Sequence, residues 1–152
     1  MQYADTNVIV AAYFETGGHT TTVERYLRKL RQPLVVGELA ELECRSVFAR
    51  KERQADSEVW QNLVARLDRG DWRREPVVWE RLATQAKALS DRFAARLSYG
   101  SFDGLHVAAA LVAGCSDFLS FDTNSNARVL AASARLKVWP ELSPDERTRV
   151  VR

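Results

Sequence analysis

Short apolar segments alternate with longer helical patterns along this chain, and that alternation limits the possible folds more than any other feature. Residues 34–36 have the pattern of a buried strand, and Gly37 separates them from a strong helical pattern over residues 38–53. The segments expected to be strands are residues 2–4, 34–36, 73–78, 118–121 and 136–139. Helical patterns cover residues 8–14, 20–30, 38–53, 57–67, 79–97, 102–113 and 125–135. This order predicts an α/β fold with a parallel central sheet and helices on both faces.

Composition agrees with one small globular domain. The 152 residues carry 22 Lys and Arg against 20 Asp and Glu, so the net charge of +2 does not by itself indicate nucleic acid. Cys44 and Cys115 are too few for a disulfide framework, and we expect them to be reduced and buried in a cytoplasmic protein. We find no signal-peptide pattern and no apolar run long enough to cross a membrane.

We expect the chain to consist of one domain followed by a short C-terminal tail. Residues 1–139 carry the alternating pattern, and we assign them to a single domain. Residues 140–152 are polar, and we expect them to form a C-terminal tail that is peripheral or frayed.

Two acids follow expected strands directly. Asp5 comes after residues 2–4, and Asp122 comes after residues 118–121. Because the carboxyl ends of parallel strands meet at one edge of the sheet, both acids are expected at that edge, where α/β proteins bind their ligands. Each acid also has a simpler interpretation, since Asp5 can cap the helix that follows it and Asp122 can cap the turn before the next helix.

Two further acids occupy unusual places in helices. Leu39, Leu42 and Val47 define the apolar arc of residues 38–53. Glu43 falls inside this arc, between Leu39 and Val47, where a carboxylate is costly to desolvate. An ion pair with Arg50 or Arg96 is the alternative for it. Asp103 lies in the first turn of the most apolar helix, where an acid also complements the helix dipole.

These four acids together indicate a divalent cation. Neighbouring carboxylates resist joint ionisation, and a hard cation such as Mg²⁺ or Mn²⁺ removes that repulsion. The Cys and His spacing does not suit zinc. A site of this kind activates water and binds a phosphodiester, so the residues indicate phosphodiester hydrolysis.

Two other groups of residues have open roles. His106 shares a helix face with Asp103, and a general base is conceivable, but we favour a buried histidine bonded to backbone. The basic side chains of two segments form either a solvated face or a surface that tracks RNA phosphates. They are Arg25, Arg28, Lys29, Arg31, Arg73 and Arg74.

Four motifs in order give the chain a familiar pattern. They are YADTNVIVAAYF, GELAELECRSVFAR, SFDGLHVAAAL and FLSFDTNSNARVLAA, and each holds one of the four acids. Over residues 1–139 this pattern resembles the PIN-domain family, and within it the VapC-type toxins of toxin–antitoxin systems. The resemblance implies a three-layer α/β/α fold with a short-stranded parallel sheet. It also implies a Mg²⁺- or Mn²⁺-dependent ribonuclease, a homodimer, a cytoplasmic location and a cognate antitoxin partner.

The family's functional residues carry over onto specific positions. Its catalytic and metal-binding acids fall on Asp5, Glu43, Asp103 and Asp122. Its polar residues that contact substrate phosphate or hold the acids fall on Thr6 and Ser120. Asn7 stands where family members often have serine, a departure that affects fine positioning.

We therefore predict a metal-dependent endoribonuclease, the toxin of a toxin–antitoxin pair. The alternative is a non-catalytic PIN-like module that binds RNA or an antitoxin. An aspartyl-phosphate phosphatase is disfavoured, because that class uses two aspartates in a D-x-D motif and Asn7 occupies the second place.

Overall fold

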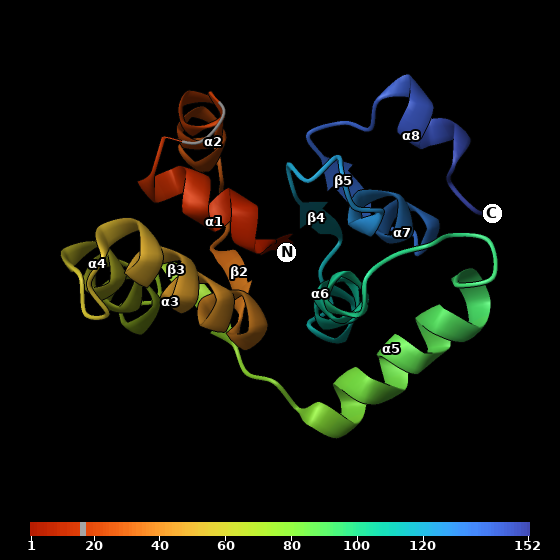
Figure 1. Ribbon diagram of the computed structural model, residues 1–152, viewed down its shortest axis with the longest axis horizontal. Helices are drawn as coiled ribbons and strands as arrows, with labels where there is room; N and C mark the ends of the chain where they lie inside the picture. Colours follow the sequence, from red (N-terminus) through yellow and green to blue (C-terminus); the bar gives the residue numbers. More distant parts are fainter. Residues whose placement is uncertain (16–17) are drawn as a thin grey trace.

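The strands form one five-stranded sheet in which every neighbouring pair is parallel (Figure 1). The computed structural model describes residues 1–15 and 18–152. The strands are β1 (Gln2–Ala4), β2 (Leu34–Gly37), β3 (Trp72–Glu75), β4 (Asp117–Leu119) and β5 (Lys137–Trp139). Their order across the sheet is β3-β2-β1-β4-β5. The chain moves outward from β1 through β2 and β3, then returns to the other side of β1, so strand order reverses between β1 and β4.

Helices cover both faces of this sheet. The helices α1 (Thr6–Tyr13), α2 (Thr20–Leu27), α3 (Glu38–Glu52) and α4 (Glu58–Asp68) pack on one face. The helices α5 (Trp79–Phe93), α6 (Ser101–Val112) and α7 (Ala127–Ser133) pack on the other, and α8 (Pro144–Thr148) follows β5. This arrangement confirms the predicted three-layer α/β/α architecture.

The alternation of side chains along each strand divides the core into two layers. In β1, Tyr3 packs with the α5–α7 layer, and Ala4 packs with the α1–α4 layer. In β4, Phe118 and Leu119 divide in the same way. Because both faces are covered, the central strands are apolar on both sides, which explains why they appear in the sequence as short continuous apolar runs.

Two strands, β3 and β4, end earlier than the sequence suggests, and β3 ends at Glu75 rather than at residue 78. The β4 strand ends at Leu119, not at residue 121, because its register pairs Leu119 with Ala4 and with Trp139, where β1 and β5 also end. Ser120 and Phe121 therefore lie beyond the sheet, at the edge where the strand order reverses. The helix expected over residues 79–97 ends at Phe93.

The buried face of α3 differs from the predicted apolar arc. Leu42 was placed on that arc, but it is 61% exposed. The residues of α3 that are buried are Ala40, Cys44 and Phe48. Two of these are small, so the helix lies close to the sheet, and the larger leucine is left outside. Glu43 consequently lies at the border of the buried face and is partly exposed.

The last thirteen residues contact the rest of the fold. They contain α8, whose Glu146 is buried against Arg128 of α7. Val150 and Val151 pack on the α5–α7 layer. The division of the chain at residue 139 stays a prediction. Within the described part of the chain, no helix combines the length and the apolar character that a membrane span requires.

Candidate functional site

Asp5 occupies the point where β1 ends and α1 begins. Its backbone N–H donates to the carbonyl of Leu119 at 2.9 Å, which fixes it against the end of β4. Its Oδ1 accepts from the N–H of Thr6 at 2.7 Å, so the helix-capping interpretation holds. The residue is buried, and the rigid strand end determines where its carboxylate lies.

Two polar side chains orient the second oxygen of Asp5. Its Oδ2 accepts from Nδ2 of Asn7 and from Oγ of Ser120, each at 2.8 Å. Oδ1 of Asn7 in turn accepts from the N–H of Phe121 at 2.8 Å. Asn7 therefore links α1 to the segment after β4, which a shorter serine could not do at the same distances. Asn7 and Ser120 thus both donate to the carboxylate of Asp5 and fix its orientation.

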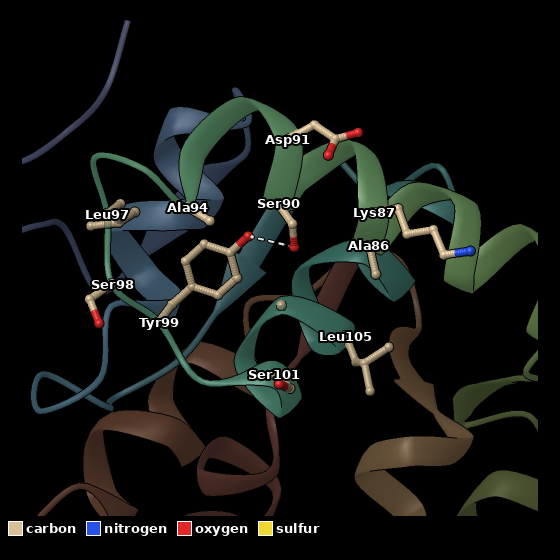
Figure 2. Close-up of a pocket in the computed structure, with 11 residues that line it drawn as sticks. Ala86, Lys87, Ser90, Asp91, Ala94, Leu97, Ser98, Tyr99, Ser101 and Leu105 are labelled. Atoms are coloured by element: carbon tan, nitrogen blue, oxygen red, sulfur yellow. Dashed lines mark hydrogen bonds between the residues drawn. The ribbon is translucent and has the colours of Figure 1, made fainter.

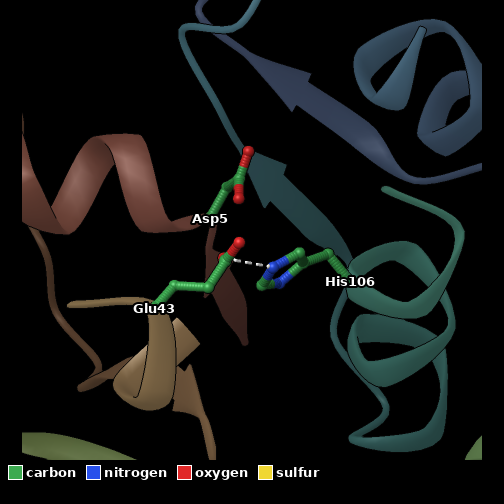
Figure 3. Close-up of side chains that lie close together, drawn as sticks. All are labelled: Asp5, Glu43 and His106. Carbon is green, nitrogen blue, oxygen red and sulfur yellow. Dashed lines mark hydrogen bonds and ion pairs between the residues drawn. The ribbon is translucent and has the colours of Figure 1, made fainter. Parts of the chain in front are cut away.

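Glu43 and His106 meet Asp5 from the two helical layers (Figure 3). Oε2 of Glu43, on α3, lies 2.7 Å from Nε2 of His106, on α6, and also accepts from the hydroxyl of Thr6. The expected backbone partner of His106 was wrong, because both of its ring nitrogens contact side chains. Within the described residues no arginine forms an ion pair with Glu43, so the Arg50 or Arg96 alternative was also wrong.

Tyr3 contacts the imidazole of His106, a role that the sequence analysis did not assign to it. Its hydroxyl lies 3.1 Å from Nδ1 of the imidazole and is fully buried. Gly37, at the end of β2, leaves room for that hydroxyl, since a Cβ atom there would lie 2.6 Å from it. A buried tyrosine hydroxyl requires a polar partner, and that requirement was the available signal.

The pKa shifts of these groups have separate causes. Burial raises the pKa of Asp5 above its usual value, although His106 and the hydrogen bond from Ser120 oppose the shift. The hydrogen bond from His106 lowers the pKa of Glu43. Burial disfavours the charged form of His106, but the hydrogen bond with Glu43 and the charges of Asp5 and Glu43 together raise its pKa. A protonated imidazole thus offsets part of the repulsion between the two carboxylates.

The other two predicted acids are engaged elsewhere. Oδ2 of Asp103 accepts from the N–H of Gly100 at 3.1 Å, which caps the start of α6. Oδ1 of Asp122 accepts from the N–H groups of Asn124 and Ser125 at 2.8 and 3.1 Å, which closes the turn before α7. Their capping interpretations hold, and their participation in a metal site stays a prediction.

The donor atoms of the central cluster fit a divalent cation. One ligand atom from each of Asp5, Glu43 and His106 lies within 4.8 Å of the other two. Carboxylate oxygens suit Mg²⁺ and Mn²⁺, and the imidazole, once it has lost its proton, offers a nitrogen that transition metals accept. Asp5 directly follows β1, Glu43 lies on α3 and His106 on α6, so the fold itself brings the ligands together.

A separate cavity of about 500 Å³ lies between α5 and α6 (Figure 2). The Tyr99 ring lies in it, and its hydroxyl is 3.3 Å from Oγ of Ser90. A Cβ atom at Gly104 would lie 2.9 Å from that ring, so a larger residue beside Asp103 would force the ring to shift. None of the three cluster residues lines this cavity.

Arg73 and Arg74, two of the six cations whose role was left open, are paired with acids. Arg74 bonds Glu41 at 2.8 Å and Asp68 at 2.9 Å. Arg73 bonds Glu75 at 2.9 Å. These pairs favour the solvated-face interpretation for both arginines.

Comparisons with known proteins agree with this fold. The family model described as PIN domain matches residues 3–147. The crystal structure of VapC20 from Mycobacterium tuberculosis, described as a sarcin-ricin loop cleaving toxin, is 18% identical with a TM-score of 0.69. That alignment covers 92% of this chain and 100% of the other. FitAcB from Neisseria gonorrhoeae is 19% identical with a TM-score of 0.66, over 91% of this chain and 96% of the other.

At these identities the two structures show a shared fold, and they confirm the PIN-like architecture predicted from the motifs. The comparison with curated protein sequences found no significant match.

Proposed function

The chain belongs to the PIN-domain family, and from that premise we propose that it is a Mg²⁺- or Mn²⁺-dependent endoribonuclease, the toxin of a toxin–antitoxin pair. One observation carries the proposal. Carboxylates of Asp5 and Glu43, from different elements, lie with His106 at the edge where strand order reverses between β1 and β4. Ligands of open parallel sheets bind at such an edge.

The residues of this edge have distinct roles in the proposal. Asp5 and Glu43 hold the cation, and Asp103 and Asp122 complete the acidic site directly or through water. When bound, the cation supplies a water of lowered pKa and stabilises charge on the phosphodiester. Asn7 and Ser120 orient Asp5, while Thr6 and His106 orient Glu43. A carboxylate held by two donors loses little entropy when it binds a ligand, so the site is pre-organised.

The partners follow from the same family membership. We propose RNA as the substrate, a cognate antitoxin as the protein partner, a homodimer as the assembly, and the cytoplasm as the location. The description of VapC20 as a toxin that cleaves the sarcin-ricin loop supports an RNA substrate here. Its particular target is not carried over to this chain.

A cleavage assay on a pool of structured RNAs, tRNA included, tests the proposal. Wild type is incubated with Mg²⁺ or Mn²⁺ and with EDTA, beside Asp5→Asn and Asp103→Asn. Asp145→Asn is the matched control, because this acid is exposed on α8, outside the cluster. We expect metal-dependent cutting by wild type and the control, and none by the two site variants. If the site variants cut as well as wild type, the assignment of the acids is wrong.

A non-catalytic module that binds RNA or antitoxin is the second candidate. It is favoured by the caps that Asp103 and Asp122 form, since these hydrogen bonds account for both acids without a metal. Thermal melting with Mn²⁺ separates the two candidates. A ligand that binds only the native state at one hundred times its Kd stabilises by about 2.7 kcal/mol. A module without a metal site shows no such rise in Tm.

A further inference from the structure

An exposed aromatic ring stands beside the acid cluster on the α6 side. Phe102 lies in the first turn of α6 and is 46% exposed, whereas large apolar side chains are normally buried. Its ring centroid lies 6.0 Å from that of His106, whose Nε2 bonds Glu43. The next residue along the chain is Asp103. Nothing in the described fold packs over this ring enough to bury it.

A second aromatic pair stands on the α1–α2 side of the same cluster. Phe121 follows Ser120 directly, and its backbone N–H is bonded to Asn7, the residue that also holds Asp5. The ring of His19 stacks on Phe121, with centroids 4.3 Å apart and an interplanar angle of 10°. His19 is exposed, so the pair presents an aromatic surface to solvent.

The two aromatic groups therefore flank the cluster from opposite helical layers. Phe102 belongs to the layer of α6, and Phe121 packs with the layer of α1 and α2. One residue lies between each aromatic group and a carboxylate of the cluster. His106 lies between Phe102 and Glu43, to which it is hydrogen-bonded. Ser120 lies between Phe121 and Asp5, to which it donates a hydrogen bond. A phosphodiester held at the carboxylates would have one nucleotide on each side of it, and one aromatic group lies in each helical layer beside the cluster.

We propose that Phe102 and the His19–Phe121 pair stack on unpaired nucleobases on either side of the scissile phosphodiester. Such stacks require unpaired bases, because paired bases cannot present their faces to protein rings. Stacking on aromatic side chains tolerates different bases, so these groups select for unpaired structure more than for sequence. The inference rests on the proposed function for the cut itself, but the binding it predicts is independent of cleavage.

The contacts of Phe121 and His19 agree with a rigid stacking surface. Phe121 contacts Trp139 with a centroid distance of 5.4 Å, so its ring is held in place from within. His19 covers one side of that ring and is itself open to solvent. For Phe102, a contact with a protein partner would equally remove apolar surface from water, so the experiment must distinguish the two occupants.

Binding in EDTA provides the first test. A short fluorescein-labelled single-stranded RNA of mixed sequence and the same RNA annealed to its complement are titrated with wild type, Phe102→Ala and His19→Ala. Trp79→Ala is the matched control, because this aromatic residue is 64% exposed at the start of α5, outside the cluster. We expect Phe102→Ala and His19→Ala each to weaken single-strand binding by about five-fold to a hundred-fold, with Trp79→Ala unchanged. Duplex binding should be weaker in wild type and unaltered by the variants.

Cleavage of an RNA with an abasic nucleotide next to the cut provides the second test. In wild type the abasic RNA should raise KM by the same factor as Phe102→Ala or His19→Ala, with kcat little changed. Each variant is also tested with RNA that is abasic at the position its substituted ring contacts. KM should then rise no further, because the substitution and the missing base remove the same stack. Phe102→Tyr should restore binding.

The outcomes separate this inference from the proposed function. If wild type cuts no RNA but prefers single strands through Phe102 and His19, the nuclease proposal fails and this inference holds. If the variants bind and cut like wild type, the inference is overturned. It is also overturned if Phe102→Ala changes only the oligomeric state, since the ring then serves a protein contact.

Discussion

A buried ion pair joins the end of the chain to the site edge, and removing one partner should be strongly destabilising. Arg128 and Glu146 are each 3% exposed, and Nε of the arginine lies 2.7 Å from Oε1 of the glutamate. The same guanidinium donates to the carbonyl of Ser120, and to those of Pro140 and Glu141 at 3.0 and 3.2 Å. Arg128 thus ties the segment after β5 to the residue that holds Asp5.

Glu146→Ala leaves this guanidinium buried with carbonyl partners but no counter-charge. Breaking a buried pair by removing one partner costs roughly 3–5 kcal/mol. The carbonyl hydrogen bonds remain, so we expect the lower part of that range, about 3 kcal/mol. For a chain of this size each kcal/mol shifts Tm by roughly 2–4 °C, which predicts a fall of about 10 °C.

Urea unfolding followed by circular dichroism measures this difference. Asp145→Ala is the control, since its side chain is 86% exposed and its ion pair with Arg149 is 3.5 Å long. Exposed pairs contribute about 0–1 kcal/mol, so this neighbour should unfold nearly like wild type. Equal losses in the two variants would refute the argument that burial of the pair determines its effect.

The contribution of Glu146 should also depend on pH with a definite sign. Burial acts to raise its pKa, but the hydrogen bonds from Arg128 and the N–H of Ser143 outweigh burial, and the net pKa is lowered in the folded state. A lowered folded pKa means that the stabilisation is fully present above the unfolded value and is lost as pH falls through the folded value. The difference in Tm between wild type and Glu146→Ala should therefore shrink below about pH 4. A difference that grows on acidification would contradict this.

Three other substitutions or treatments have expected outcomes. Gly37→Ala should lower the free energy of unfolding by about 1–3 kcal/mol, because its Cβ would lie 2.6 Å from the hydroxyl of Tyr3; a neutral result in urea unfolding would show that Tyr3 moves freely. Asp5→Asn should abolish the Mn²⁺-induced rise in Tm, and a retained rise would place the metal elsewhere. Cys44 and Cys115 should not react with Ellman's reagent at pH 8 in the native state, since burial raises both pKa values, that of Cys115 to about 11; rapid labelling would contradict this.

The parallel sheet and the position of Asp5 could be predicted from local patterns. Strands buried on both faces leave continuous apolar runs, and helices between them imply parallel crossovers. An acid directly after such a run must lie at the carboxyl edge wherever the strand is placed in the sheet. The strand order itself depends on long-range pairing, which no local pattern encodes.

The prediction that Glu43 faces inward from its helix rested on a partly wrong reason. A hydrophobicity wheel assumes that large apolar residues define the buried face, and it selected Leu42 together with Leu39 and Val47. In the structure, Ala40 and Cys44 allow α3 to lie close to the sheet, and Leu42 is exposed. Glu43 reaches the site from the border of that face. Close packing through small residues depends on the neighbouring layer, so the sequence of one helix cannot reveal it.

The network around His106 shows why its role could not be derived from its own helix. Its two ring nitrogens contact Tyr3 of β1 and Glu43 of α3, which lie 103 and 63 residues away along the chain. Gly37 of β2 leaves the space that the tyrosine hydroxyl occupies. Three separate elements thus determine one imidazole's orientation, and all three meet at the carboxyl edge of β1 because β1 is the central strand. An acid after the central strand is within reach of both helical layers. An acid at an outer strand end, such as one after β3, would lack β1 and β4 as neighbours, so the strand order makes Asp5 the residue around which the others gather.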